Sequence, residues 1–200
     1  MYKRQTDIVY GQSVPNNGFG YQPAKSGVAY AGLITMIETD GREYIQTTLT
    51  DSLTAGVTYT VKFYVSAADS SPYAANNIGA YFSNNPVSSG DSWYLPFTPQ
   101  IKNDSSANPL DDRYGWTEVF GSFIAQGGEK FITIGNFNND LNTDTTFHSD
   151  GSTWLSFSYH YIDDVSVTDS TLSLYEEFNQ SQISVYPLSL IHISEPTRLR

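Results

Sequence analysis

Apolar and polar side chains alternate with a period of two along several short segments of this chain. The clearest segment is the range 58–67, whose apolar positions are Tyr59, Val61, Phe63, Val65 and Ala67. Successive side chains of a strand point to opposite faces, so this pattern predicts a half-buried β-strand. No segment of convincing length repeats with the period of an amphipathic helix. Many short strands separated by turn residues predict an all-β fold, a β-sandwich of the jelly-roll type.

Further strands are predicted at 43–50, 78–83, 116–125, 130–137 and 154–167. Thr54-Ala55-Gly56 supplies the turn before the strand at 58–67. The Gly127-Gly128 pair predicts a tight hairpin between the strands at 116–125 and 130–137, because glycine tolerates positive φ angles. The adjacent Asp163 and Asp164 interrupt the last strand and indicate a β-bulge.

Composition excludes several classes of function. The 200 residues suffice for a domain with its own core, and the absence of cysteine excludes disulfides and thiolate metal sites. The formal charge of −11 argues against nucleic acid as a partner, since phosphates would be repelled. No apolar run approaches the ~20 residues of a membrane-spanning helix. We expect a monomeric module.

The two ends of the chain differ from the rest. Residues 1–5 and 188–200 resemble peptides translated from sequencing-adapter DNA, and they hold Lys3, Arg4, Arg198 and Arg200. A genuine amphipathic tail is the alternative. No signal-peptide pattern starts the chain, so we expect a fragment of a longer protein. The functional residues are therefore expected between these ends.

Two long polar stretches, 84–112 and 138–153, interrupt the predicted strands. The first contains Pro86, Pro96, Pro99 and Pro109, and the second is rich in Asn, Asp and Thr. Long loops on a rigid β scaffold often carry binding residues. We therefore expect these two loops to hold the functional surface.

Taken in order, ten short runs from about Val14 to Val167 resemble the galactose-binding-like carbohydrate-binding modules of surface proteins from gliding Gram-negative bacteria. The runs are 27–32, 43–46, 53–59, 70–74, 78–83, Gly115-Trp116-Thr117, 121–125, 127–130, Ile134-Gly135-Asn136-Phe137 and Tyr161-Ile162-Asp163-Asp164-Val165-Ser166-Val167. The resemblance implies a jelly roll that binds carbohydrate without catalysis, secreted or attached to the outer cell surface. The family's opening Asn-Pro-x-Phe-Glu-like strand has no counterpart here, so we expect the first strand to be missing.

Residues 182–187, Gln-Ile-Ser-Val-Tyr-Pro, resemble the start of the C-terminal sorting domain read by type IX secretion. Leu188-Ser189 stands where that domain continues with Asn-Pro, and an ordinary strand ending at a proline is the alternative. The resemblance implies the type IX secretion machinery as a partner. The expected organisation is a domain at 6–168, followed at 169–187 by a linker and the start of this signal.

The resemblance also implies that Asp163 or Asp164 binds a structural Ca²⁺, an ion that takes roughly six to eight oxygen ligands. A solvated strand end or bulge is the alternative. Asp140, Asn142 and Asp144 are spaced as at the start of an EF-hand loop. Thr145 replaces the required glycine and Gly151 the required glutamate, so a polar loop is the better interpretation.

No catalytic pattern emerges from the sequence. Ser92 follows no apolar strand, and His148 and His160 lie in no arrangement typical of a nucleophile's base. Glu118, Glu129, Glu176 and Glu177 show no pairing motif of a glycosidase. We expect a protein that is not an enzyme.

Sugar-binding candidates are aromatic rings that stack on sugar C–H faces and polar groups that meet hydroxyls. The candidates are Trp93, Tyr94, Arg113, Tyr64, Tyr81 and Asn136, with Asn103 nearby. Tyr64 and Tyr81 lie on the polar faces of their strands, where they belong to a shallow binding face or simply meet solvent. Trp116 and Trp154 are expected to pack inward.

The sequence thus favours a glycan-binding module. Two alternatives stay open, a structural or adhesive spacer of a surface protein and an accessory domain of a hydrolase.

Overall fold

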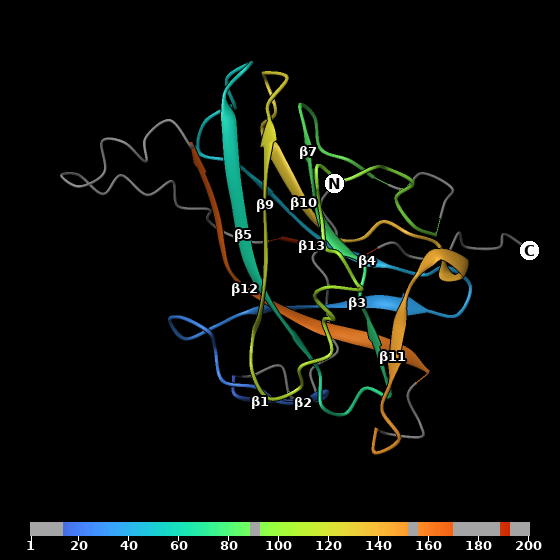
Figure 1. Ribbon diagram of the computed structural model, residues 1–200. Coiled ribbons are helices and arrows are strands. Elements are labelled where there is room, and N and C mark those ends of the chain that lie inside the picture. Colours follow the sequence, from blue (N-terminus) through green and yellow to red (C-terminus); the bar gives the residue numbers. More distant parts are fainter. Residues whose placement is uncertain (1–13, 89–92, 152–155, 170–188, 193–200) are drawn as a thin grey trace, which may run out of the picture.

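A computed structural model of the chain describes residues 14–88, 93–151, 156–169 and the backbone of 189–192. Nearly all of its regular structure is β (Figure 1). The elements are β1 (Asn16–Asn17), β2 (Gly20–Tyr21), β3 (Ala31–Ile37), β4 (Glu43–Thr48), β5 (Thr58–Ala67), β6 (Tyr73–Ala75), β7 (Ile78–Ser83), β8 (Ile101–Lys102), β9 (Thr117–Ile124), β10 (Phe131–Asn136), the 3₁₀ turn η1 (Asp140–Asn142), β11 (Thr145–Phe147), β12 (Phe157–Asp169) and β13 (Ser189–His192).

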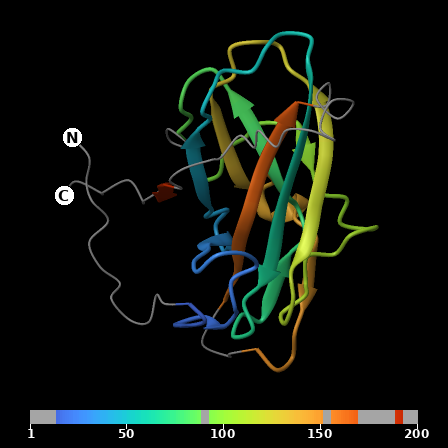
Figure 2. The same cartoon turned by 90° about the vertical axis from the view of Figure 1, so that its left-hand side faces the viewer.

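The described strands form two main sheets and a small β1–β2 ribbon. One sheet has the order β13-β4-β10-β7-β8. The other has the order β11-β6-β12-β5-β9, with β3 also paired to β12. Figure 2 shows β12, β5 and β9 side by side, coloured from orange through teal to yellow. The predicted all-β sandwich is confirmed.

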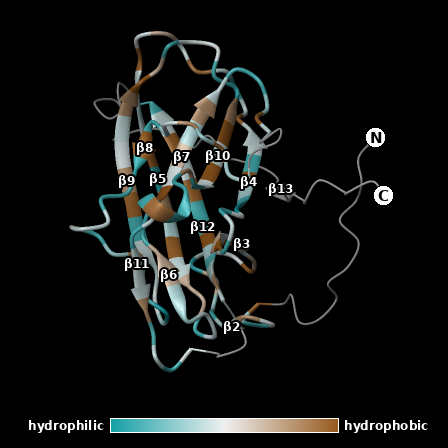
Figure 3. Cartoon of the chain, turned by 90° about the vertical axis from the view of Figure 1, so that its right-hand side faces the viewer, coloured by the Kyte–Doolittle hydropathy of each residue, from teal (hydrophilic) through white to brown (hydrophobic). Residues whose placement is uncertain are grey.

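Apolar side chains from the inner faces of both sheets fill one core. In β5 the odd positions Tyr59 to Ala67 are buried and the even positions Thr60 to Tyr64 are half-buried, as the alternation predicts. Val61 and Phe63 meet Ile78, Ile132 and other residues of the opposite sheet. The resulting bands of brown and paler colour are visible along the strands in Figure 3. Removal of this surface from water is the main force that holds the two sheets together.

The Gly127-Gly128 turn joins the two sheets and is not a hairpin. β9 pairs with β5 in one sheet, whereas β10 pairs with β4 and β7 in the other. The prediction of positive φ was right, at 97° and 88°, but the predicted hairpin is wrong. The buried Glu129 carboxylate accepts hydrogen bonds from the backbone N–H groups of Gln126 and Gly127 and thereby closes the crossover.

The predicted bulge in β12 is present and reverses which side chains of the strand face the core. The register against β5 shifts between Asp163 and Ser166 by one residue, and Asp164 adopts a φ of 53°. Before the bulge Ile162 points into the core, and after it Val167 does. One extra residue therefore lets a 13-residue strand keep an apolar inner face on both sides of the bulge.

The segment 14–30 covers part of the outer face of the β3-containing sheet. Phe19 stacks on Tyr159 with ring centroids 3.9 Å apart, and Tyr30 contacts Tyr161 at 4.7 Å. The Trp116 indole donates a hydrogen bond of 3.0 Å to the Pro23 carbonyl. Trp116 thus lies beside this segment, half-exposed, so the prediction that it packs into the core is wrong. Trp116 directly precedes β9, and as an even position it continues the outer face of that strand, whose odd positions point inward.

Several sequence predictions concern residues outside the described ranges. These are the end 1–5, Ser92, Trp154, Glu176, Glu177 and the sorting-signal resemblance at 182–187. Ser189–His192, within the predicted adapter-derived end, pair antiparallel with β4 at the edge of its sheet. In the part of the chain that the structure describes, no helix has the length and apolar character needed to cross a membrane.

Candidate binding cavity

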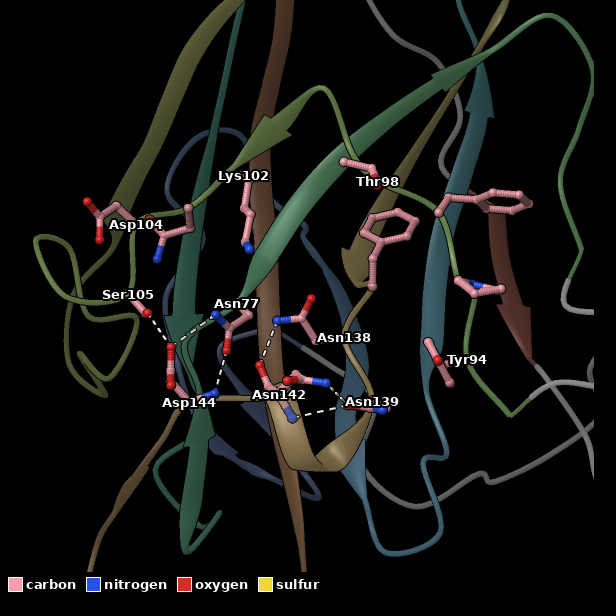
Figure 4. A pocket seen from close by; sticks show the side chains of 14 residues that line it. Asn77, Tyr94, Thr98, Lys102, Asp104, Ser105, Asn138, Asn139, Asn142 and Asp144 are labelled. Atoms are coloured by element: carbon pink, nitrogen blue, oxygen red, sulfur yellow. Dashed lines mark hydrogen bonds between the residues drawn. The ribbon is translucent and has the colours of Figure 1, made fainter.

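The two long polar loops meet at one cavity of about 770 Å³ (Figure 4). Its walls come from the segment around β8, from the loop that contains η1, and from the residue before β7. The lining residues are Asn77, Tyr94, Pro96, Phe97, Thr98, Lys102, Asn103, Asp104, Ser105, Phe137, Asn138, Asn139, Asn142 and Asp144. A volume of this size accommodates a small ligand or a few units of a chain.

One wall of the cavity is aromatic. Phe97 stacks on Tyr81 with ring centroids 4.9 Å apart and an interplanar angle of 7°. Behind it, Tyr44, Leu95 and Phe137 form a second apolar cluster on the outer face of the β4-containing sheet. Figure 4 shows Tyr94 on the same side of the cavity as this wall. Residues 94–97 thus bring Tyr94 and Phe97 to the cavity, while Leu95 of the same segment packs on the outer face of the sheet.

Side-chain amides line the foot of the cavity. Asn138 donates to the Asn142 carbonyl at 2.7 Å, and the Asn142 amide donates to Asn139 Oδ1 at 2.7 Å. Arg42, at the start of β4, holds this loop from beneath. Its buried guanidinium pairs with Asp140 at 2.8 Å and donates to the Asn138 carbonyl at 3.2 Å. The buried Arg42 guanidinium therefore anchors the η1 loop at the base of the cavity.

Asp144, Asn77 and Ser105 form the polar corner opposite the aromatic wall. Hydrogen bonds from the Ser105 hydroxyl and from the Asn77 amide lower the pKa of the Asp144 carboxyl, and nearby Lys102 adds to the effect. Asp144 therefore stays ionised at neutral pH. The Lys102 side chain extends toward Asn77 and Asn138 in Figure 4.

The structure brings only some of the sequence-predicted candidates to this cavity. Tyr94 and Asn103 line it, whereas Trp93 is half-buried and is not one of the described lining residues. Asn136 is fully buried behind the cavity, where its amide donates to the Thr35 carbonyl and its oxygen accepts from the Asn138 N–H. Asn136 thus supports the η1 loop and does not face the ligand space.

The other candidates lie elsewhere. Tyr81 is covered by Phe97, and Tyr64 lies on the outer face of the other sheet, under Lys25 Nζ at 4.5 Å. A single shallow face that carries both tyrosines is therefore excluded, because the outer faces of a sandwich point away from each other. Arg113 is buried and pairs with Asp150 at 2.6 Å, away from the cavity.

Asp163 has a structural role that the sequence does not reveal. Its Oδ2 accepts from the backbone N–H groups of Lys25 and Ser26 at 2.8 and 3.1 Å, and its Oδ1 accepts from the Asp164 N–H at 2.7 Å. Asp164 is exposed. No cluster of three or more His, Cys, Asp or Glu side chains able to hold a metal occurs among the described residues. Ca²⁺ binding at Asp163 or Asp164 stays a prediction of the resemblance.

His160 is fully buried in a hydrogen-bond network between the sheets. Because a carbonyl only accepts, Nε2 donates to the Leu110 carbonyl at 2.9 Å, and Nδ1 accepts from the Thr35 hydroxyl at 2.8 Å. Burial lowers the pKa of His160 to about 4, so the ring is neutral. A side chain without access to solvent and with both nitrogens occupied stabilises the core and does not face a substrate.

Sequence reasoning missed most of the cavity. Asn77, Lys102 and Asn138 were not singled out, and the Asp140–Asp144 pattern was treated only as a failed metal loop. The available signal was the polar composition of the two loops, which marks them as exposed but does not say that they meet. Their meeting depends on how β8 and η1 are placed beside β7 and β10.

The chain matches no known family model, and no curated protein matches it. Among solved structures it is similar to the apo form of the carbohydrate-binding module (CBM) of PbXyn10C, with 19% identity and a TM-score of 0.38 over 82% of this chain and 89% of that one. It is also similar to the K1 cleaved adhesin domain of Lys-gingipain from Porphyromonas gingivalis W83, with 17% identity and a TM-score of 0.42 over 76% and 82% of the two chains. The K2 domain of Lys-gingipain gives 15% identity and a TM-score of 0.40 over 72% and 74%. At these values the likenesses assign no function to this chain.

Proposed function

We propose that this domain binds carbohydrate, without catalysis, in the cavity between the β8 segment and the η1 loop. The observation that carries the proposal is the combination of an aromatic wall, Tyr94 and Phe97, with a foot of side-chain amides. Sugar rings present apolar C–H faces that stack on aromatic rings. Their hydroxyls both donate and accept, as the amides of Asn138, Asn139 and Asn142 do.

The support beneath the cavity favours binding with little rearrangement. Phe97 is held by its stack on Tyr81, and the η1 loop is held by the buried Arg42–Asp140 pair. A ligand then meets side chains whose conformations are already restricted, which reduces the entropy lost on binding. Anchoring of this kind supports a role in recognition, even though the site is built from loops.

The proposal includes a location outside the cell. The residues from Val14 to Val167 resemble modules of bacterial surface proteins, and 182–187 resemble the start of a type IX sorting domain. The domain would then act as a monomeric module that tethers a secreted or surface-attached protein to glycan. Export of a reporter fused to a C-terminal sorting domain that begins at Gln182 tests this part separately.

Binding is tested on a glycan array and by affinity gels, with wild type, Tyr94→Ala, Asn142→Ala and the control Tyr114→Ala. Tyr114 is 81% exposed and does not line the cavity. Tyr94→Ala is expected to weaken binding about fivefold or more, since a stacked ring contributes roughly 1 kcal/mol. Asn142→Ala removes a hydrogen-bonding amide and should weaken binding by about twofold to tenfold. The control should bind as wild type does. If no glycan is retained by wild type, with or without Ca²⁺, the proposal is wrong.

A structural or adhesive spacer is the second candidate, and the surface of β9 favours it. Phe120 and Ile124 are each 61% exposed on the outer face of this strand, which ends its sheet. Exposed apolar groups at a sheet edge suit contact with another protein. For a spacer the Tyr94→Ala variant loses nothing, whereas Phe120→Ser weakens association with neighbouring domains.

A further inference from the structure

The cavity presents free hydrogen-bond donors and acceptors in comparable measure. Among the described residues, Asn139 Nδ2 has no hydrogen-bond partner, and the same holds for Asn138 Oδ1 and Asn142 Oδ1. Lys102 Nζ adds a donor, and Asp144 Oδ1 adds an acceptor. A hydroxyl both donates and accepts, so it can meet either kind of group. A carboxylate or sulfate only accepts and leaves the free oxygens unmatched.

The charges that line the cavity sum to −1. Lys102 contributes +1, and Asp104 and Asp144 contribute −1 each. Both carboxyl groups have a lowered pKa, Asp104 through hydrogen bonds from Ser106 and Asp144 through Ser105 and Asn77. They are therefore ionised at neutral pH. Lys102 lowers the pKa of Asp144 further, so its positive charge is already partly balanced within the protein.

Charges on the rest of the molecule act in the same direction. The whole chain carries a formal charge of −11. The Debye length at physiological salt is about 8 Å, so the carboxylates of the cavity are screened less than charges farther away. An acidic glycan would meet unfavourable local charge on entry.

We propose that the cavity selects an uncharged sugar chain and rejects glycans that carry uronate or sulfate. This inference rests on the carbohydrate-binding function proposed above and adds the chemical class of the ligand. Lys102 then donates to a hydroxyl or ring oxygen and does not pair with a ligand anion. The ionised Asp144 accepts from a hydroxyl, which a neutral sugar supplies and an acidic group does not.

The probe is a glycan array with matched uncharged and acidic members, such as methyl-esterified polygalacturonate beside the free acid, read at 50 and 300 mM NaCl. We expect wild type to retain uncharged glycans and Tyr94→Ala to release them. The wild-type signal for these glycans should change less than about twofold between the two salt concentrations. An acidic glycan that is retained more strongly than its uncharged match overturns this inference alone. A blank array overturns the proposed function and this inference with it.

Lys102→Gln provides a second measurement by titration calorimetry with the retained glycan. Gln keeps a donor and loses the charge, so affinity should fall by about threefold to fivefold, equally at both salt concentrations. A loss of more than about tenfold that shrinks as salt rises would show that the lysine pairs with a ligand anion. Lys62→Gln, on the other sheet with its Nζ 6.0 Å from the Tyr64 ring centroid, is the matched control.

Discussion

The Tyr44 hydroxyl accepts a hydrogen bond of 2.9 Å from the Leu95 amide, which follows directly on Tyr94 in the cavity wall. The same hydroxyl donates to the Asn136 carbonyl at 2.7 Å. Tyr44 and Leu95 are both buried, and burial strongly raises the pKa of the phenol. One neutral hydroxyl therefore ties the segment that carries Tyr94 and Phe97 to the two strands β4 and β10.

Tyr44→Phe should reduce the free energy of unfolding by about 1–3 kcal/mol, because the Leu95 N–H and the Asn136 C=O are left buried without this partner. Urea denaturation measures the change. Amide hydrogen exchange at Leu95 should accelerate in the variant. Tyr21→Phe, at a site 54% exposed, is the control and should change stability by less than about 0.5 kcal/mol. Equal stability of the two variants would contradict the anchoring role.

His160 makes stability depend on pH in the acidic range. Its pKa is about 4 in the folded protein and about 6.5 when unfolded. Between these values the unfolded chain takes up a proton that the folded chain excludes, so stability decreases as pH falls. The expected slope is up to about 1.4 kcal/mol per pH unit for this one residue. Urea denaturation at a series of pH values from neutral to pH 4.5 measures it.

His160→Gln removes this dependence, because Gln does not titrate. The stability of wild type relative to His160→Gln should fall as pH drops below about 6.5, whatever the carboxyl groups contribute to each curve. NMR provides a reading on the wild type alone. The His160 ring signal should stay at its neutral position from pH 8 to pH 5, and a midpoint near 6.5 would contradict the buried, neutral assignment.

Asp163→Asn should destabilise the domain by about 1–3 kcal/mol, because an amide nitrogen cannot accept the backbone N–H bonds that Oδ1 and Oδ2 now share. The segment 22–30 should also become more sensitive to proteolysis. Asp164→Asn is the matched control, since Asn tolerates the φ of 53° and the side chain is exposed. A rise in Tm with Ca²⁺ that disappears in Asp163→Asn would instead assign an ion to this carboxylate.

Gly127→Ala should cost about 2–4 kcal/mol of stability, through a φ of 97° and a new methyl group 2.8 Å from the Ala55 Cβ. Gly56→Ala is the matched comparison. Its φ is 77°, but nothing lies within 4 Å of the added methyl, so only the backbone strain of roughly 1–2 kcal/mol applies. Thermal unfolding measures both variants, and equal losses would show that the crossover at Ala55 is loosely packed.

Local sequence pattern predicted β4, β5, β7, β9, β10 and β12, but not β3, β6, β8 or β11. The ranges 58–67 and 78–83 were predicted to the residue, and the bulge at Asp163-Asp164 was recognised. Alternation is a property of consecutive residues on a pleated backbone, so it needs no knowledge of distant partners. The two polar stretches were expected as loops, yet 84–112 contains β8 and the buried Leu95, Ile101 and Leu110, and 138–153 contains β11.

Which strands pair was decided only by the tertiary structure. The Gly127-Gly128 turn has the glycines of a hairpin, yet β9 and β10 enter different sheets, and Val119 and Ile132 both lie in the core between those sheets. Trp116 was misplaced for a related reason. Its inward packing was expected from its place at the start of a predicted strand, whereas its indole donates to the Pro23 carbonyl of the segment 14–30.

The β class and the apolar inner faces of the strands thus follow from the sequence alone, since each depends on neighbours along the chain. The tertiary structure alone decided that Tyr94, Lys102, Asn138 and Asp144 surround one cavity, and that Asp163 holds the segment 14–30. Contacts of this kind join residues separated by tens of positions. They arise from sheet packing and buried hydrogen bonds that no local pattern encodes.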